Sequence, residues 1–415
     1  MNLLLKSSIV SLQSSIQISG SKSETNRLLL LQALYPNLTL ENTSNSDDSE
    51  VMIKALGIHH PSPNPHCIDI HHAGTAMRFL TAYFSIQENS EIILTGSSRM
   101  KERPIKILVE ALRQIGAEIS YEENEGFPPI RIKGKKLTQN KVSLAANVSS
   151  QYISALLLIA PKLENGLELT LEGKITSVPY INMTLTLLNE IGVETSFIEN
   201  IIKVNPKSQI PNPKSIIVES DWSSASYFYS IVALSKTGTE ITLSSYKENS
   251  LQGDSVLSEI YKEFGVETGY DDDIILLKKS QIPNPKSQIL NLNNSPDIAQ
   301  TIAVTCFGLG IGCHLTGLHT LKIKETDRLL ALKNELEKLG ATVVISDDSL
   351  TLEPSSTIHS NIKIQTYQDH RMAMAFAPLA LKTHIIIEDA EVVSKSYPAF
   401  WEDLKRIGFQ ITEQQ

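Results

Sequence analysis

The chain places arginine and lysine side chains where helices are predicted to begin, an unfavourable position for a cation. Segments that open with small, polar or charged residues and continue as apolar runs predict helix starts, and they contain Lys22, Arg27, Arg78, Arg328 and Arg371. A helix N-terminus carries partial positive charge, so a nearby cation raises the electrostatic free energy. Backbone amides and basic side chains together bind phosphate or carboxylate. The repeated choice therefore predicts an anion-binding site.

Two carboxylates accompany these cations. Glu325 comes three residues before Arg328, so both side chains can share one face of a helical turn. Asp297 follows Pro296 at another predicted helix start, where an acid also complements the helix dipole. A carboxylate among several cations stays ionised, which suits a base in proton transfer. From the residues alone, both the structural and the catalytic interpretation of Asp297 stay open.

A weak internal repeat indicates the elements that position these residues. The phrases ALRQIGAEIS, LLNEIGVETS, EIYKEFGVET, ELEKLGATVV and DLKRIGFQIT each end a predicted amphipathic helix at a glycine and continue as a short strand. A glycine just past a helix supplies a left-handed C-terminal cap. A period of roughly 70 residues fits one unit of mixed helix and strand, so six copies predict two domains of three units. The cap glycines are Gly116, Gly192, Gly265, Gly340, Gly408 and, in a weaker copy, Gly57.

Bulk properties exclude several classes of protein. A length of 415 residues favours two domains, and a net charge of -9 argues against a general nucleic-acid binder. The sequence shows no signal peptide and no apolar run long enough to span a membrane, so a cytoplasmic location is expected. Three cysteines do not form a disulfide framework. The histidine-rich segment 59–72 contains prolines that predict a loop without paired ligand spacing, so no metal is expected.

Nine motifs, in order along nearly the whole chain, resemble those of the 5-enolpyruvylshikimate-3-phosphate synthase family. They are GSKSETNR (20–27), AGTAMR (73–78), RMKERP (99–104), NVSSQ (147–151), SASYF (224–228), PDIAQTIA (296–303), KETDRL (324–329), DHRMAM (369–374) and SKSYP (394–398). The resemblance implies an α/β fold of two similar domains, each of three βαβαββ units, in an inverse α/β barrel with the active site in the interdomain cleft. The domains are expected at 20–219, mainly for shikimate 3-phosphate, and at 1–19 with 220–415, for the catalytic carboxylates and much of the phosphoenolpyruvate site.

The activity implied by the resemblance is transfer of the enolpyruvyl group of phosphoenolpyruvate to the 5-hydroxyl of shikimate 3-phosphate. Addition gives a tetrahedral intermediate, and elimination then releases phosphate, in the biosynthesis of chorismate and aromatic amino acids. Clustered lysine and arginine side chains neutralise the substrate charge, so neither a metal nor another cofactor is expected. We expect a cytoplasmic monomer whose partners are these two substrates, with no nucleic acid and no membrane.

The matching positions assign the expected site residues. The catalytic residues are expected to be Asp297, Glu325 and Lys22. The ligands of shikimate 3-phosphate are expected to be Lys22, Ser23, Arg27, Ser149, Ser150, Gln151, Ser177, Asp297 and Lys324. The ligands of phosphoenolpyruvate are expected to be Lys22, Gly74, Arg99, Gln151, Arg328, His370, Arg371 and Lys395.

Several positions depart from the family pattern. Thr320 stands where many members have an asparagine that contacts shikimate phosphate, Phe79 stands where many have proline, and His72 replaces the common asparagine before AGTAMR. A rival function is the sister transfer to UDP-N-acetylglucosamine, whose enzymes carry a reactive cysteine at the RMKERP position. This chain has no cysteine between Cys67 and Cys306. A non-catalytic anion-binding protein is a second rival, which the presence of Asp297, Glu325 and Lys22 disfavours.

Overall fold

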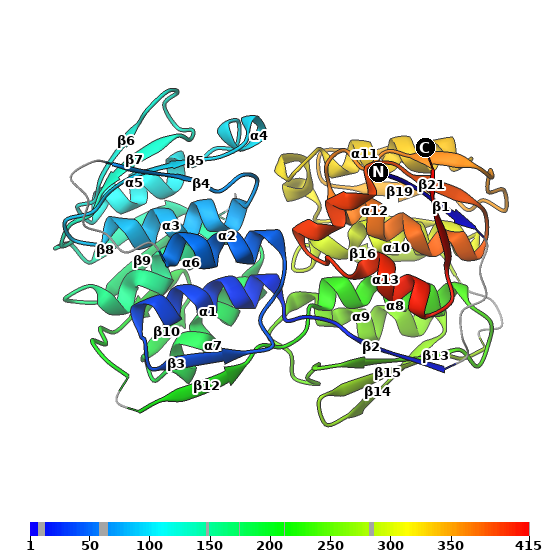
Figure 1. Cartoon of the computed structure of the whole chain (residues 1–415), viewed down its shortest axis with the longest axis horizontal. Coiled ribbons are helices and arrows are strands. Elements are labelled where there is room, and N and C mark those ends of the chain that lie inside the picture. Colours follow the sequence, from blue (N-terminus) through cyan, green and yellow to red (C-terminus); the bar gives the residue numbers. More distant parts are fainter. Residues whose placement is uncertain are drawn as a thin grey trace. The chain divides into compact units, whose positions relative to one another are not determined.

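The chain folds into two compact units (Figure 1). The computed structural model describes residues 1–6, 13–57, 65–146, 149–173, 175–210, 212–281 and 286–414. Unit 1 comprises Met1–Gly20 and Glu219–Gln415, and unit 2 comprises Ser21–Val218. The sequence-based boundaries put Gly20 and Glu219 in the other unit. Both belong to unit 1, because Gly20 bridges to Ser220 and Glu219 accepts a hydrogen bond from Trp222 Nε1 at 2.7 Å.

Unit 2 repeats one sheet pattern, a parallel pair of strands followed by an antiparallel hairpin. The first sheet, in spatial order, is β4 (His66–Asp69), β5 (Glu91–Thr95), β7 (Ile130–Lys133) and β6 (Glu118–Tyr121). The second is β8 (Lys141–Ala145), β9 (Leu167–Glu172), β11 (Ile201–Val204) and β10 (Thr195–Ile198). In both, the first two strands are parallel and the other contacts are antiparallel. Within the described ranges the third sheet is the parallel pair β12 (Lys214–Ile217) and β3 (Leu38–Glu41).

Unit 1 has three sheets of the same kind, and the chain's first strands complete two of them. One sheet is β2 (Gln13–Gln17), β13 (Glu240–Ser244), β15 (Ile274–Lys279) and β14 (Val266–Asp271). Another is β16 (Gln288–Asn291), β17 (Cys313–Thr316), β19 (Leu350–Leu352) and β18 (Val343–Ile345). The third is β20 (Ile362–Ile364), β21 (Ile385–Ile387), β1 (Asn2–Lys6) and β22 (Gln410–Gln414). The predicted α/β class with repeated βαβαββ units is confirmed.

Helices fill the space between the sheets of each unit (Figure 1). Those of unit 2 are α1 (Lys22–Leu34), α2 (Asp47–Leu56), α3 (Gly74–Ser85), α4 (Ser98–Lys101), α5 (Lys106–Gln114), α6 (Ser150–Ile159) and α7 (Val178–Glu190). Those of unit 1 are α8 (Trp222–Leu234), α9 (Leu257–Ile260), α10 (Ala299–Leu309), α11 (Arg328–Lys338), α12 (His370–Phe376) and α13 (Phe400–Arg406). Helix α8 is buried along its whole length, in keeping with its mostly apolar composition. No helix in the described ranges is long and apolar enough to cross a membrane.

The predicted cap glycines have the backbone geometry that a helix end requires in five of six cases. Their φ angles are positive, at 104° for Gly116, 83° for Gly192, 75° for Gly265, 102° for Gly340 and 109° for Gly408. A side chain is disfavoured there, so glycine is the residue that ends the helix. The prediction for Gly57 is wrong, because it follows α2 with φ at -77°, in the ordinary right-handed region.

Candidate active site

Arg328 lies at the centre of a buried cluster of charges in unit 1. It is the first residue of α11, follows the N-cap Asp327, and is only 2% exposed. Its Nε donates to Asp369 Oδ2 at 2.6 Å, and its terminal nitrogens donate to Asp297 Oδ1 and Glu325 Oε2, both at 2.8 Å. The structure therefore brings Arg328 together with both predicted catalytic carboxylates. Burial opposes the charge of Arg328, but these three carboxylates outweigh burial and raise the pKa of its guanidinium.

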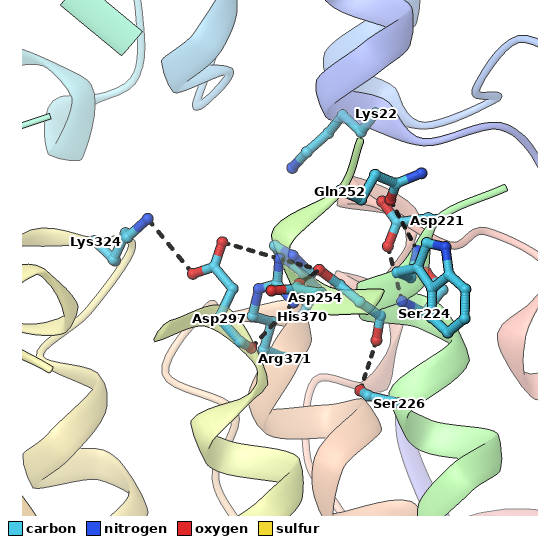
Figure 2. Close-up of polar contacts among 12 residues, drawn as sticks. Lys22, Asp221, Ser224, Ser226, Gln252, Asp254, Asp297, Lys324, His370 and Arg371 are labelled. Atoms are coloured by element: carbon cyan, nitrogen blue, oxygen red, sulfur yellow. Dashed lines mark hydrogen bonds and ion pairs between the residues drawn. The ribbon is translucent and has the colours of Figure 1, made fainter. Parts of the chain in front are cut away.

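Lys324, Arg328 and Arg371 all contact the carboxylate of Asp297. Figure 2 shows Asp297 with Lys324 and Arg371. Asp297 lies in the short 3-10 helix η4 (Pro296–Ile298). Lys324 Nζ lies 3.5 Å from its Oδ1, and Arg371 donates to its Oδ2 and to its backbone oxygen, both at 3.2 Å. Burial alone would raise its pKa, but Arg371, Lys324 and Arg328 together hold the pKa well below the ordinary value. Asp297 is thus ionised at neutral pH and has an oxygen shared with each arginine.

Three more residues of unit 1 that are predicted to bind phosphoenolpyruvate, or that contact such a residue, lie at or near the start of α12. Asp369 caps this helix by accepting from Arg371 N at 2.9 Å, and the same carboxylate binds Arg328. His370 is buried at the first position of the helix, with Nδ1 3.9 Å from Asp369 Oδ1. Lys395, in η7 (Ala390–Lys395), donates to the backbone oxygen of Gln368 at 2.7 Å. The side chains from four separate segments of unit 1 therefore meet at helix starts.

Unit 2 also gathers its predicted site residues at the starts of helices. Lys22 is the first residue of α1, and its Nζ lies 3.4 Å from Asp48 in α2. Ser149 caps α6 by accepting from Gln151 N at 3.3 Å, and the Gln151 side chain donates to Thr75 in α3 at 3.1 Å. Ser23 and Ser150 lie in the first turns of α1 and α6, and Ser177 precedes α7 with a left-handed φ of 54°. Asn147 and Val148 of the NVSSQ motif lie outside the described residues.

Arg27 binds groups of its own unit. Its guanidinium is 2% exposed and donates to Thr184 Oγ1 at 2.8 Å and to Ser154 Oγ at 2.9 Å. It also donates to the Ser23 backbone oxygen at 2.6 Å. Burial lowers its pKa to about 10, which leaves it protonated at neutral pH. Arg27 thus ties α1 to α6 and α7, and this contact supports the position of Ser23.

Sequence reasoning missed Arg103, the second arginine of the RMKERP motif. A β-carbon built on Gly74 would lie 2.7 Å from Arg103 Nη1, so this guanidinium lies directly against the start of α3. Arg99, which was predicted instead, is half exposed in α4 and pairs with Glu102 at 2.9 Å. Lys101 likewise pairs with Glu123 near the surface, at 2.7 Å. The spacing of the motif gave no means of choosing among its three cations, because the choice depends on how the turn folds back onto α3.

The departures from the family pattern have structural counterparts. Phe79 is buried, and the centre of its ring lies 5.5 Å from the Arg27 guanidinium carbon, a cation–π contact that a proline would lack. His72 lines a cavity of about 440 Å³ in unit 2 together with Asp48, the partner of Lys22. Thr320 is buried in η5 (His319–Ile323), just before Lys324.

Arg78, another of the cations predicted at helix starts, donates to the backbone oxygens of Gly74 and Pro104, at 2.9 and 3.4 Å.

Comparison with known proteins identifies the family. A profile described as EPSP synthase (3-phosphoshikimate 1-carboxyvinyltransferase) matches residues 37–404. The chain is 46% identical to the 3-phosphoshikimate 1-carboxyvinyltransferase of Bacteroides fragilis over 407 residues, with 96% of each chain covered. It is 36% identical to the protein of the same name from Haemophilus influenzae, with 96% of this chain and 97% of that protein covered.

Solved structures show the same fold at lower identity. EPSP synthase from Acinetobacter baumannii superimposes with a TM-score of 0.80 at 20% identity, covering 99% of this chain and all of the other. The enolpyruvyl transferase NikO from Streptomyces tendae superimposes with a TM-score of 0.77 at 14% identity, covering 100% of this chain and 98% of the other. The profile match and the relatives of 46% and 36% identity show that the chain belongs to the EPSP synthase family of carboxyvinyltransferases.

Proposed function

We propose that this chain catalyses the 3-phosphoshikimate 1-carboxyvinyltransferase reaction of the shikimate pathway, with the residues described above as its machinery. The observation that carries the proposal is the cluster of Asp297 and Glu325 on Arg328, with Arg371 and Lys324 beside Asp297. It combines two carboxylates, of which Asp297 is held ionised, with cations that can bind anionic substrates. The family membership supports the choice of substrates.

In this proposal the donor, phosphoenolpyruvate, binds to Arg328, Arg371 and Lys395. Most of the N–H groups of Arg328 already bind carboxylates, so the donor has to replace part of these contacts. The displaced carboxylate keeps its charge, so the bound donor adds negative charge to the cluster, which Arg328, Arg371 and Lys395 have to balance. From unit 2 we assign Arg103 to the donor in place of Arg99, because Arg103 lies against Gly74. Lys22, Gly74, Gln151 and His370 complete the proposed donor set.

The acceptor, shikimate 3-phosphate, is assigned to hydroxyl and amide donors at helix starts in unit 2. Ser149, Ser150 and Gln151 open α6, where backbone amides add to the field that favours a phosphate. Lys22 and Ser23 open α1, and Ser177 precedes α7. Arg27 fixes this arrangement through its contacts with Ser154 and Thr184. Asp297 and Lys324 of unit 1 are the proposed ligands of the acceptor's ring hydroxyls.

The proposed chemistry is an addition followed by an elimination. The acceptor oxygen forms a bond to C2 of phosphoenolpyruvate while Asp297 takes the hydroxyl proton and C3 gains a proton. Next, the bond from C2 to the phosphate oxygen breaks as C3 loses a proton, which restores the double bond. Glu325 and Lys22 are the proposed partners for the proton at C3. Asp297 is ionised and can therefore accept the hydroxyl proton, while the cations that lower its pKa also weaken it as a base. The same cations stabilise the negative charge of both substrates.

Phosphate release tests the proposed substrates. Purified protein is given phosphoenolpyruvate and either shikimate 3-phosphate or UDP-N-acetylglucosamine, and inorganic phosphate is measured over time. We expect phosphate release when the acceptor is shikimate 3-phosphate and none when it is UDP-N-acetylglucosamine. Turnover only with the sugar nucleotide would show that the chain performs the sister reaction. Absence of turnover with both acceptors would contradict enzymatic function.

Asp297→Asn tests the base. The amide keeps the shape of the side chain but does not accept a proton, so we expect kcat to fall by about 100-fold or more. Asp347→Asn is the matched control, because Asp347 also pairs with a lysine, Lys322, but is 99% exposed. We expect the control to keep its rate. Steady-state kinetics of both variants decide the matter, and a near-normal kcat in Asp297→Asn would remove Asp297 from the chemistry.

We also propose that the enzyme acts as a cytoplasmic monomer, in keeping with the biosynthetic role of its family. Each unit has its own set of three sheets and an apolar interior, so neither needs a second copy to complete a sheet among the described strands. Sedimentation equilibrium at micromolar concentration measures the mass directly. A mass of twice the 45.9 kDa of one chain would contradict the proposal.

A further inference from the structure

Asp254 is a buried aspartate of unit 1 that is linked through Ser223 to Arg371, one of the arginines proposed to bind phosphoenolpyruvate. It is not among the proposed catalytic or substrate-binding residues. It is part of the short 3-10 helix η2 (Gly253–Val256) and is only 2% exposed. Its Oδ2 accepts a hydrogen bond from the Ser223 hydroxyl. Its Oδ1 is buried and has no hydrogen-bond partner within the part of the chain that the structure describes. A buried carboxyl with one unsatisfied oxygen costs folding free energy, so packing alone does not account for an acid here.

Ser223 connects this aspartate to Arg371. Figure 2 shows Asp254 and Arg371 in the same region as Asp297. Ser223 lies in the first turn of α8, and its Oγ accepts from Arg371 Nη2 at 3.2 Å. A serine hydroxyl has one proton, which Ser223 gives to Asp254. Its lone pairs are therefore turned toward Arg371. The same Nη2 also donates to Asp297 Oδ2 at 3.2 Å, so one nitrogen is held between the serine and the proposed base.

The charges around Asp254 come from three elements. Asp297 of η4 and Asp221, the N-cap of α8, are negative, and Arg371 of α12 is positive. Burial, followed by the charge of Asp297, raises the pKa of Asp254 to about 7, while Arg371 and the Ser223 hydrogen bond act in the opposite direction. With this raised pKa, the Asp254 carboxyl titrates near neutral pH instead of near pH 4. A further anion bound to Arg371 will favour its protonated form.

We propose that Asp254 is a positioning residue of the donor site, which holds the Arg371 guanidinium in place through the Ser223 hydroxyl and takes up a proton when the donor anion binds. The inference rests on the proposed role of Arg371 in binding phosphoenolpyruvate. No covalent step is assigned to Asp254, since it acts on the substrate only through Ser223 and Arg371. Its proton comes from solvent and returns there when the product leaves.

Ser223→Ala tests the positioning role with the smallest change. Loss of the hydroxyl removes an acceptor from Arg371, and we expect KM for phosphoenolpyruvate to rise by about 10-fold. We expect kcat to change by less than about 3-fold and KM for shikimate 3-phosphate to stay constant. Ser226→Ala is the matched control, because Ser226 is a buried serine one turn further along α8 that bonds to Thr301 and to the Ser223 backbone oxygen. Its kinetic constants should match those of the wild type.

Asp254→Ala should also raise KM for phosphoenolpyruvate. The double variant Asp254→Ala with Ser223→Ala should have a KM no higher than that of the single variant with the larger increase, because both residues act on Arg371 through the same hydrogen bonds. If the two effects on KM were additive, Asp254 and Ser223 would act independently, and the proposed positioning of Arg371 by Asp254 through Ser223 would be overturned. An unchanged KM for phosphoenolpyruvate in folded Ser223→Ala would also overturn it. Loss of wild-type turnover with shikimate 3-phosphate is a separate result that contradicts the proposed function itself.

Asp254→Asn tests proton uptake, because the amide keeps an acceptor for Ser223 and does not titrate. We expect the ratio of wild-type KM to Asp254→Asn KM for phosphoenolpyruvate to rise by about 5-fold between pH 6 and pH 8. The ratio cancels the ionisation of the substrate itself. A role limited to filling space would give a constant ratio across this range, and that result would overturn the proton uptake.

Discussion

At the scale of single residues, the cations at helix starts have partners within their own units. Arg328 opens α11 but is surrounded by Asp297, Glu325 and Asp369, and Lys22 opens α1 beside Asp48. These carboxylates offset the unfavourable interaction with the helix dipole when no substrate is bound. An anionic substrate offers the same compensation. The sequence signal therefore identified a region built for negative charge, which the protein's own acids occupy in part.

The buried carboxyl of Asp254 makes folding stability depend on pH. Its pKa in the folded protein is about 7, against an ordinary value of 3.8. Below pH 4 the carboxyl is protonated in both the folded and the unfolded chain, and its full contribution to the free energy of unfolding is present. Between pH 4 and pH 7 the unfolded chain loses the proton more readily, so the stability of the folded protein falls as pH rises and then levels off.

Asp254→Asn lacks this dependence, so the free energy of unfolding of the variant minus that of the wild type is the quantity to follow. From pH 5 to pH 8 we expect this difference to shift in favour of the variant by about 2–3 kcal/mol. Urea denaturation across the pH range measures it, and the other titrating groups largely cancel between the two proteins. A difference that stays constant with pH would show that Asp254 has an ordinary pKa.

At the scale of the elements, short polar side chains at helix starts both cap the helix and contact residues of the proposed site. Asp369 caps α12 through Arg371 N and holds Arg328 with the same carboxylate. Asp221 caps α8 through Ser224 N at 2.7 Å, which fixes the turn that carries Ser223. Because the caps set the direction of the first turn, they also set where the neighbouring side chains point. Replacing a cap here is expected to disturb stability and binding together.

The glycines that end the helices can be tested by comparing two of them. Gly116 has φ at 104° with open space at its β-carbon position, so Gly116→Ala isolates the backbone cost, which we expect at about 1 kcal/mol. Gly57 has φ at -77°, and Gly57→Ala should change stability by less than about 0.5 kcal/mol. Chemical denaturation of both variants provides the measurement. Equal losses would contradict a cap role for Gly116.

At the scale of the whole molecule, the chain leaves unit 1 after Gly20 and returns at Glu219. A short segment of unit 1 that contains Gln252 holds the returning residues 219–222. The Gln252 side chain donates to the Ser220 backbone oxygen and accepts from Trp222 N, both at 2.9 Å, and it is 6% exposed. Two residues further on, Asp254 binds Ser223. The same segment therefore fixes both the point of return and the serine that contacts Arg371.

Gln252→Ala leaves two buried backbone groups without a partner, so we expect a loss of about 2–3 kcal/mol in the free energy of unfolding. Gln114→Ala is the control. Gln114 also makes two backbone contacts, donating to Ser143 O at 3.0 Å and accepting from Ser143 N at 2.9 Å, but its side chain is exposed. Water replaces those bonds, and the loss should stay below about 1 kcal/mol. If urea denaturation gave comparable losses for the two variants, the two buried hydrogen bonds of Gln252 would not be what holds residues 219–222.

The sequence by itself determined the class of fold, the period of the repeat and the segments that carry the proposed site, because these depend on local patterns. Glycines after amphipathic runs predicted helix ends, and five of the six have the expected backbone angles. Apolar runs after polar openings predicted the helix starts that carry Lys22, Arg328 and Arg371. The nine ordered motifs indicated the family, which the relatives of higher identity confirm.

Only the tertiary structure decided which charged groups meet. It placed Arg103 against Gly74 and left Arg99 paired at the surface, although both belong to one short motif. It also placed Asp254 behind Arg371, which comes more than a hundred residues later in the chain. Burial and charge pairing arise between segments that are distant in sequence, and they set the ionisation of a carboxyl through its surroundings. Local patterns carry no record of those surroundings, so the structure was needed to find Asp254.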